Sequence, residues 1–129
     1  RSAQGQVQMI GAAGAAKKNV VIPAEIVSLA NGQRFRVTAI GNNAFKNQKK
    51  LRKVTIGKNV RVIGKRAFFN CKKLRNITVK SKMLTKKTVG AKAFRGIYAR
   101  ASVKVPKKKR TLYRKILRAR GAGPQVRIR

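Results

Sequence analysis

The chain contains a six-residue motif that occurs three times. The motif reads apolar-Gly-x-x-Ala-Phe and spans residues 40–45, 63–68 and 89–94. Its copies start 23 and then 26 residues apart. A unit this short cannot bury an apolar side alone and must stack on its neighbours. The repeat therefore predicts a solenoid with coils of about 23 residues.

A second feature recurs after each motif. An apolar residue stands nine residues after each motif Phe, and a second apolar residue follows two positions later. This alternation is typical of a short strand with one buried face. These apolar pairs are Val54 and Ile56, Ile77 and Val79, and Val103 and Val105. The residues expected to face outward are Lys53, Thr55, Asn76, Thr78 and Lys104.

Upstream of the motifs, residues 20–23 align with residues 54–57 and predict an earlier strand. Residues 6–9 are a weaker strand candidate. Between them lies a stretch of Gly and Ala at residues 11–16, which we interpret as a loop. We expect the two strands to form a hairpin-like first coil.

Downstream, Pro106 is expected to end the last repeat strand. Residues 107–120 follow, with an apolar helical stripe formed by Leu112, Tyr113, Ile116 and Leu117. Gly121 suits the end of a helix. This helix is predicted to cap the open end of the solenoid, and a short final strand with Val126 and Ile128 is expected after it.

Taken together, the motifs resemble the BspA-like leucine-rich repeats of bacterial surface proteins. The resemblance includes Leu51 and Leu74, each six residues after a motif Phe, and covers roughly residues 20–106. Arg100 stands where a third Leu is expected, and the third coil has an insertion at residues 83–87, so the last coil is atypical.

The resemblance implies a β-rich α+β solenoid of leucine-rich repeat coils with a C-terminal helix as its cap. Residues 1–106 would form the solenoid, with an atypical first coil at residues 1–36. Residues 107–129 would form the helix-strand cap of the same domain. The resemblance also implies a secreted or cell-surface bacterial protein.

The chain carries 35 Lys and Arg residues against one acidic residue, Glu25, which gives a formal charge of +34. Stacked coils bring like charges together, at a cost of about 0.8 kcal/mol for a pair about 5 Å apart in water. The expected neighbours are Lys49 and Lys72, Lys50 and Lys73, and Arg52 and Arg75. A polyanion would convert this repulsion into attraction and release counterions. The predicted anion-binding residues are Lys49, Lys50, Arg52, Lys53, Lys72, Lys73, Arg75 and Lys104.

The preferred hypothesis is therefore a binding module for an acidic polymer, such as teichoic acid or a sulfated or acidic glycan, or for an acidic protein surface. Nonspecific nucleic-acid binding stays open, although the two Tyr and five Phe leave little for base stacking. An engineered, supercharged repeat scaffold also stays open. Like charge favours a monomer.

A membrane-active or antimicrobial role is another open alternative. It would depend on the basic amphipathic helix, which could lie on an anionic membrane or in a partner groove. The basic residues of that helix are Lys107, Lys108, Lys109, Arg110, Arg114, Lys115 and Arg118.

Enzyme chemistry is not expected. The chain has no His, and its one carboxylate cannot form an acid/base pair or a site for a hard metal ion. We expect no cofactor, and we expect Glu25 to be an ordinary surface residue and Cys71 a buried structural thiol. The repeat glycines are attributed to turns of the coil. Because the chain opens at Arg1 without Met, we expect a processed product or an excised fragment.

Overall fold

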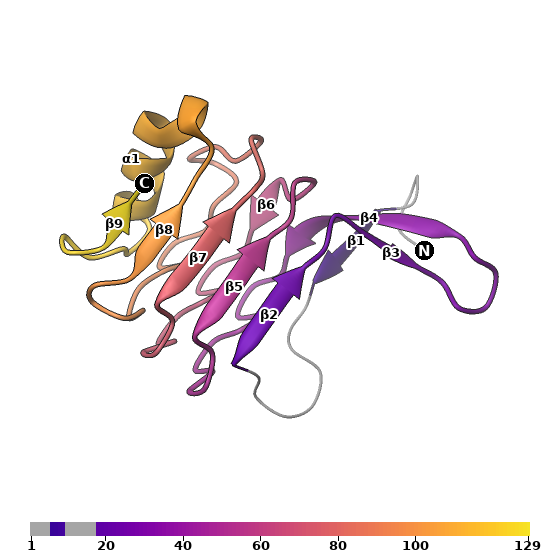
Figure 1. Cartoon of the computed structure of the whole chain (residues 1–129), viewed down its shortest axis with the longest axis horizontal. Helices are drawn as coiled ribbons and strands as arrows, with labels where there is room; N and C mark the ends of the chain where they lie inside the picture. The colour runs from indigo at the N-terminus through magenta and orange to yellow at the C-terminus, as the bar shows by residue number, and fades with distance from the viewer. Residues whose placement is uncertain (1–5, 10–17) are drawn as a thin grey trace.

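The computed structural model describes residues 6–9 and 18–129, and its main layer is a five-stranded parallel sheet. The strands lie side by side in the order β2, β5, β7, β8, β9 (Figure 1). Their register aligns Val54 with Ile77 and Ile77 with Val103, so the strand residues of successive coils form columns. The strands are β2 (Asn19–Ile22), β5 (Lys53–Ile56), β7 (Asn76–Val79), β8 (Ser102–Lys104) and β9 (Arg127–Ile128). The predicted repeat strands are thus confirmed.

A second sheet contains the strands that lead into the motifs. Strands β1 (Gln6–Met9) and β6 (Val62–Ile63) pair in parallel with β4 (Arg34–Ile40), and β3 (Glu25–Val27) pairs with β4 in antiparallel fashion. An isolated bridge from Ile63 to Val89 continues the stack into the third coil. The first residue of each motif therefore belongs to this second sheet.

The predicted hairpin-like first coil is wrong. Strand β1 pairs with β4, whereas β2 pairs with β5, so the two strands lie in different sheets. Parallel stacking explains the difference, because β1 and β2 each pair in parallel with a strand of the following coil and not with each other. The predicted loop at residues 11–16 lies outside the described residues.

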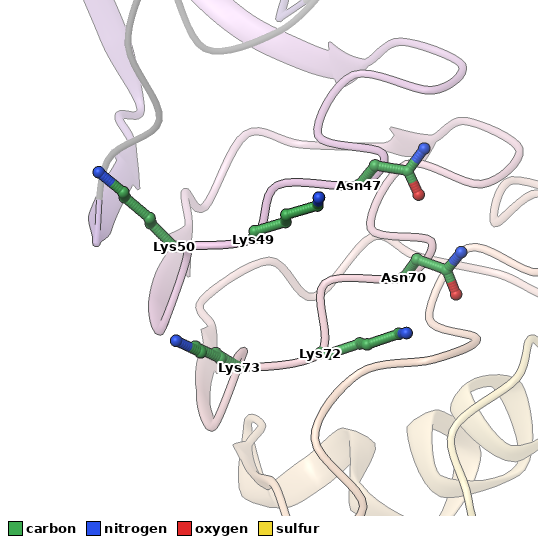
Figure 2. Close-up of a pocket in the computed structure, with 6 residues that line it drawn as sticks. All are labelled: Asn47, Lys49, Lys50, Asn70, Lys72 and Lys73. Atoms are coloured by element: carbon green, nitrogen blue, oxygen red, sulfur yellow. The ribbon is translucent and has the colours of Figure 1, made fainter.

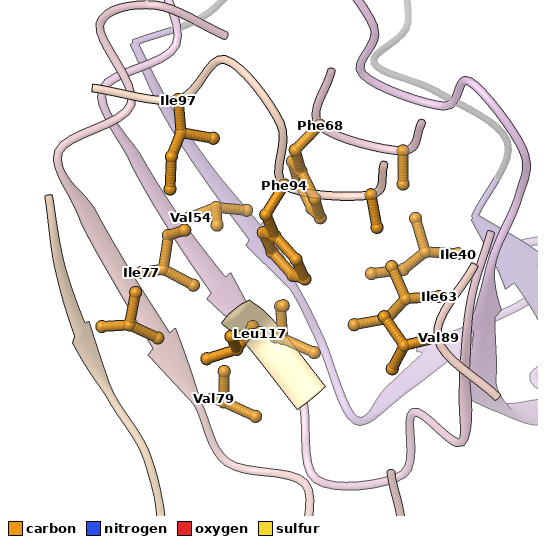
Figure 3. Packing of buried hydrophobic residues seen from close by; sticks show 14 of the residues in the cluster. Ile40, Val54, Ile63, Phe68, Ile77, Val79, Val89, Phe94, Ile97 and Leu117 are labelled. Carbon is orange, nitrogen blue, oxygen red and sulfur yellow. The ribbon is translucent and has the colours of Figure 1, made fainter. Parts of the chain in front are cut away.

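A stack of aromatic rings fills the space between the sheets. Phe45, Phe68 and Phe94 are all completely buried, and their ring centroids are 5.3 and 5.5 Å apart with nearly parallel planes. Figure 3 shows Phe68 and Phe94 with the aliphatic columns around them. Each coil supplies one ring, so the stack can form only when the coils adjoin.

The motif glycines have a different role from the expected one. Among the described residues, the glycines with positive φ are Gly32, Gly96 and Gly121, and the motif glycines are not among them. A Cβ on Gly64 would lie 2.4 Å from the Asn42 nitrogen, and one on Gly90 would lie 2.4 Å from the Lys65 nitrogen. Glycine is therefore required by the close approach of successive coils, and not by a turn.

The C-terminal cap forms as predicted. A 3₁₀ helix (Lys107–Lys109) leads into α1 (Arg110–Ala119), which buries Tyr113, Ile116 and Leu117 in the shared core. Leu112, the fourth member of the stripe, is 42% exposed. Strand β9 then returns to pair with β8 and extends the sheet.

The third coil departs from the others as expected. Arg100 is exposed at the position of Leu51 and Leu74, and the core there is filled instead by Ile97 and Ala101, both buried. The insertion holds the cap: the Leu84 N–H donates to the Tyr113 hydroxyl oxygen at 3.1 Å. Tyr113 in turn donates to the carbonyl oxygen of Ser81 at 2.8 Å.

Strand β3 and the first half of β4 form a hairpin that projects from the end of the solenoid opposite α1 (Figure 1). This element was not predicted from the sequence. Glu25 lies on it and forms an ion pair with Arg34 at 3.4 Å, with both side chains exposed. Glu25 is therefore a surface residue, as expected.

Candidate functional site

A hollow on the described surface lies beside the loops that lead into β5 and β7. It has a volume of about 620 Å³. Two carboxamides and four ammonium groups surround it, and Figure 2 shows them in two parallel rows. The lining residues are Asn47, Lys49, Lys50, Asn70, Lys72 and Lys73. We call this site the lysine hollow.

The backbone fixes both rows of the lysine hollow. Asn47 and Asn70 have φ values of 62° and 59°, in the left-handed region that Asn tolerates better than most residues, and Gly96 occupies the equivalent place in the third coil. The Asn47 N–H donates to the Phe69 oxygen at 2.8 Å. The Asn70 N–H donates to the Arg95 oxygen at 2.9 Å. The loops are therefore hydrogen-bonded to each other, and the lysines that follow are held one coil apart.

The lysine pairs stack as the repeat predicted. Lys49 and Lys72 point the same way from successive coils, and Lys50 and Lys73 form a second such pair (Figure 2). All four side chains are exposed. No acidic residue lines the hollow, since Glu25 lies on the hairpin beside Arg34. The site therefore has four positive charges without a protein counterion nearby.

The other four predicted anion-binding residues lie outside the hollow. Arg52 and Arg75 are neighbours through a backbone hydrogen bond of 2.9 Å, and the Arg75 guanidinium lies 4.8 Å from the centre of the Tyr98 ring. Lys53 and Lys104 are exposed on strands β5 and β8, and strand β7 separates them. The structure thus brings four of the eight predicted residues together in one hollow.

Sequence reasoning missed the two asparagines. The signal was present, because the pattern Asn-x-Lys-Lys occurs at residues 47–50 and again at residues 70–73. A carboxamide can both donate and accept hydrogen bonds, so Asn47 and Asn70 add a neutral polar edge to a cationic site.

The helix proposed as an alternative site has its apolar side against the solenoid. Arg118 donates hydrogen bonds to the carbonyl oxygens of Gly123 and Val126, which fastens the segment after the helix. Lys107, Lys108, Arg114 and Lys115 are exposed, and Lys109 and Arg110 are half-buried. In the part of the chain that the structure describes, no helix is long and apolar enough to cross a membrane.

Cys71 is completely buried, and its Sγ donates to the Phe45 oxygen at 3.0 Å. Burial raises the pKa of the Cys71 thiol to about 11. A buried thiol held in its protonated form is a poor nucleophile and a poor metal ligand. Within residues 6–9 and 18–129, no group of three or more His, Cys, Asp or Glu side chains is placed to hold a metal ion.

Comparison with known proteins agrees with this architecture. The family model described as "BspA type Leucine rich repeat region" matches residues 35–119, in six copies. No curated protein sequence matches the chain.

Two solved structures have a similar fold. A leucine rich cell surface protein from Faecalibacterium prausnitzii superimposes with a TM-score of 0.61 at 23% identity, over 81% of this chain and 34% of that protein. A leucine-rich repeat protein from Bacteroides capillosus gives a TM-score of 0.56 at 22% identity, over 89% of this chain and 79% of that one. This chain therefore spans about a third of the length of the first relative. The repeat motif, the stacked coils and the family match together show that the chain belongs to the BspA-type leucine-rich repeat family.

Proposed function

We propose that this chain is a non-enzymatic binding module of a bacterial cell-surface protein and that it holds acidic polymers in the lysine hollow. The observation that carries the proposal is the repeated Asn-x-Lys-Lys loop, which places four lysines around one hollow. The surface location is supported by the family match and by the relative described as a cell surface protein.

The arrangement suits a polymer better than a single small anion. Stacked strands are about 4.8 Å apart, so equivalent lysines of the two coils can contact successive acidic groups along one chain. Lysine acts as a flexible point charge and does not require the planar, two-pronged geometry that arginine prefers. The hollow should therefore accept phosphates, sulfates and carboxylates, with Asn47 and Asn70 available to hydrogen-bond neighbouring hydroxyl groups.

The first test is neutralisation of the hollow. The four substitutions Lys49→Gln, Lys50→Gln, Lys72→Gln and Lys73→Gln should weaken binding to teichoic acid or heparin about tenfold or more at physiological salt. On double-stranded DNA the logarithmic salt slope should flatten by up to about 3.6, since each phosphate neutralised by a lysine contributes about 0.9. Affinities are measured by fluorescence titration across a salt series.

The matched control removes four charges from the cap instead, through Lys107→Gln, Lys108→Gln, Arg114→Gln and Lys115→Gln. All four residues are exposed, so the net charge changes equally while the hollow stays intact. If the control weakens binding as much as the hollow variant, net charge governs the contacts and the hollow is not the site. If only the hollow variant loses affinity, the proposal stands.

A panel of polymers then distinguishes the ligand class. Teichoic acid, heparin, mucin glycans and double-stranded DNA are compared with the unmodified chain at fixed pH. One polymer bound well above the others at physiological salt would identify the receptor chemistry. Equal affinities that disappear together with similar salt slopes would contradict a selective binding role.

A further inference from the structure

The projecting hairpin exposes apolar side chains that no other described element covers. All three residues of β3 are exposed, including Ile26 at 43% and Val27 at 52%. Leu29, at the tip, is fully exposed. Large apolar side chains gathered on one protruding element mark an interaction surface more often than isolated ones do.

The tip is a well-formed turn. The Ser28 N–H donates to the Gln33 oxygen and the Gly32 N–H to the Ser28 oxygen, both at 2.8 Å. The Gln33 N–H also donates to Oδ1 of Asn31 at 2.9 Å, and Gly32 adopts a φ of 71°. Leu29 is not needed for any of these bonds, so its exposure has no structural purpose within the hairpin.

The base of the hairpin is anchored and cationic. The Ala24 oxygen accepts hydrogen bonds from the Val37 N–H and from the Asn59 side chain, both at 3.0 Å. A small hollow of about 160 Å³ lies beside this base, and Lys58 and Lys80 are among the residues that line it. Arg34 and Arg36 are exposed on the hairpin itself.

We propose that the hairpin is a membrane-contact element, with Leu29 and Val27 entering the interface of an anionic phospholipid bilayer. Charge complementarity selects this partner, because a chain of net charge +34 is attracted to a negative lipid surface before any apolar contact forms. Binding at a membrane interface combines electrostatic attraction between a basic surface and anionic lipids with the burial of a small apolar area.

The dimensions fit this partner. Strand β3 spans Glu25–Val27, or about 7 Å in extended strand geometry, and the turn that carries Leu29 lies beyond it. The headgroup region of one leaflet is roughly 6 Å deep. A hairpin that meets the membrane tip first can therefore bring Leu29 to the acyl chains while its cationic base stays among the phosphates. The lysine hollow lies before β5 and β7, whereas the hairpin follows β2, so the two sites occupy opposite ends of the parallel strands.

The test exploits the absence of tryptophan from the chain. A Leu29→Trp variant is mixed with vesicles of equal parts phosphatidylglycerol and phosphatidylcholine. Its fluorescence should shift to the blue, and lipids brominated in the acyl chain should quench it. The matched control is Leu112→Trp, which places the probe at a partly exposed apolar position on the cap helix, and its emission should stay unshifted.

A loss-of-function variant tests the same proposal without a probe. At about 0.5 M NaCl the screening length is roughly 4 Å, so the remaining vesicle affinity reports mainly apolar contact. The double variant Val27→Thr, Leu29→Asn should lower this affinity about tenfold or more, whereas Leu112→Asn should change it less than twofold.

Three results would overturn the proposal. The first is unshifted Leu29→Trp emission on vesicles that do bind the chain, and the second is no vesicle binding at any salt concentration. The third is a concentration-dependent dimer in sedimentation that Leu29→Asn abolishes, because the tip would then cover a second copy of the chain. None of these results bears on polymer binding by the lysine hollow, which is measured in solution without lipid.

Discussion

The distance between stacked coils decides which residue types fit at the glycine position of the motif. A Cβ added to Gly64 would lie 2.4 to 2.6 Å from three atoms of the preceding coil, and two of these are backbone atoms. Gly57, after β5, shows the same relation to the Ile22 oxygen at 2.5 Å. Contacts this short cannot be relieved by rotating a side chain, so glycine here is a condition for adjoining coils.

Gly64→Ala should lower the free energy of unfolding by about 1–3 kcal/mol, because the added methyl group must push two coils apart. The matched control is Gly123→Ala, where a Cβ would meet nothing within 4 Å. The control should change stability by less than about 0.5 kcal/mol. Urea unfolding followed by circular dichroism measures both, and equal stability of the two variants would show that the coils separate easily.

At the scale of elements, the cap and the insertion in the third coil form one unit. Besides the Tyr113 hydrogen bonds, Arg120 donates from Nε to the Val89 oxygen at 2.7 Å and from Nη2 to the Lys86 oxygen at 2.8 Å. The insertion thus supplies the Leu84 N–H and the Lys86 oxygen, while Ser81 and Val89 on either side of it supply the other two carbonyl oxygens that hold the helix segment. A coil without the insertion would lack the Leu84 and Lys86 partners.

Tyr113→Phe should destabilise the chain by about 1–3 kcal/mol. The substitution keeps the buried ring but leaves the Leu84 N–H without its partner and removes the bond to the Ser81 oxygen. Tyr98→Phe is the control, since Tyr98 is partly exposed and its ring, which stays, provides the contact with Arg75. Thermal unfolding compares the two variants. A Tyr113→Phe variant as stable as the control would mean that apolar packing alone holds the cap.

The repeat strands and the cap could be predicted because their apolar periodicity survives in the sequence. Val54 and Ile56 alternate with outward residues, and Tyr113, Ile116 and Leu117 lie on one helical stripe. The hairpin could not be predicted in this way, because no residue of β3 is buried, so the strand has no alternation of buried and exposed residues. The prediction of a hairpin-like first coil was wrong because the sequence of a single coil does not show which strand of the next coil each strand pairs with.

The candidate site was predictable to a similar degree. The register of the repeat alone predicts that Lys49 lies beside Lys72, because the sequences of the two coils align without a gap. The hollow itself depends on left-handed residues at Asn47 and Asn70, whose conformation a sequence pattern only suggests. Arg52 and Arg75 stack as predicted but lie outside the hollow, since side-chain direction changes from one residue to the next along the loop.

At the scale of the whole molecule, the charge of the chain opposes its fold. The sequence has thirty-five basic residues and one acidic residue, Glu25, which is already paired with Arg34. The core that resists this repulsion is one continuous cluster from Ile22 to Ile128. Anions that gather on the surface should therefore stabilise the folded chain, and a bound polymer should do so more effectively than simple salt.

This balance predicts that the melting temperature rises with salt. Between about 0.01 and 0.3 M NaCl the screening length falls from roughly 30 Å to about 6 Å, so repulsion between coils weakens. For a chain of this length, about 1 kcal/mol of relief corresponds to a rise of roughly 3–5 °C. The variant with Gln at positions 49, 50, 72 and 73 should start from a higher melting temperature at low salt and rise less steeply. Differential scanning calorimetry measures both slopes, and a flat or falling curve for the unmodified chain would show that its like charges are too well solvated to oppose folding.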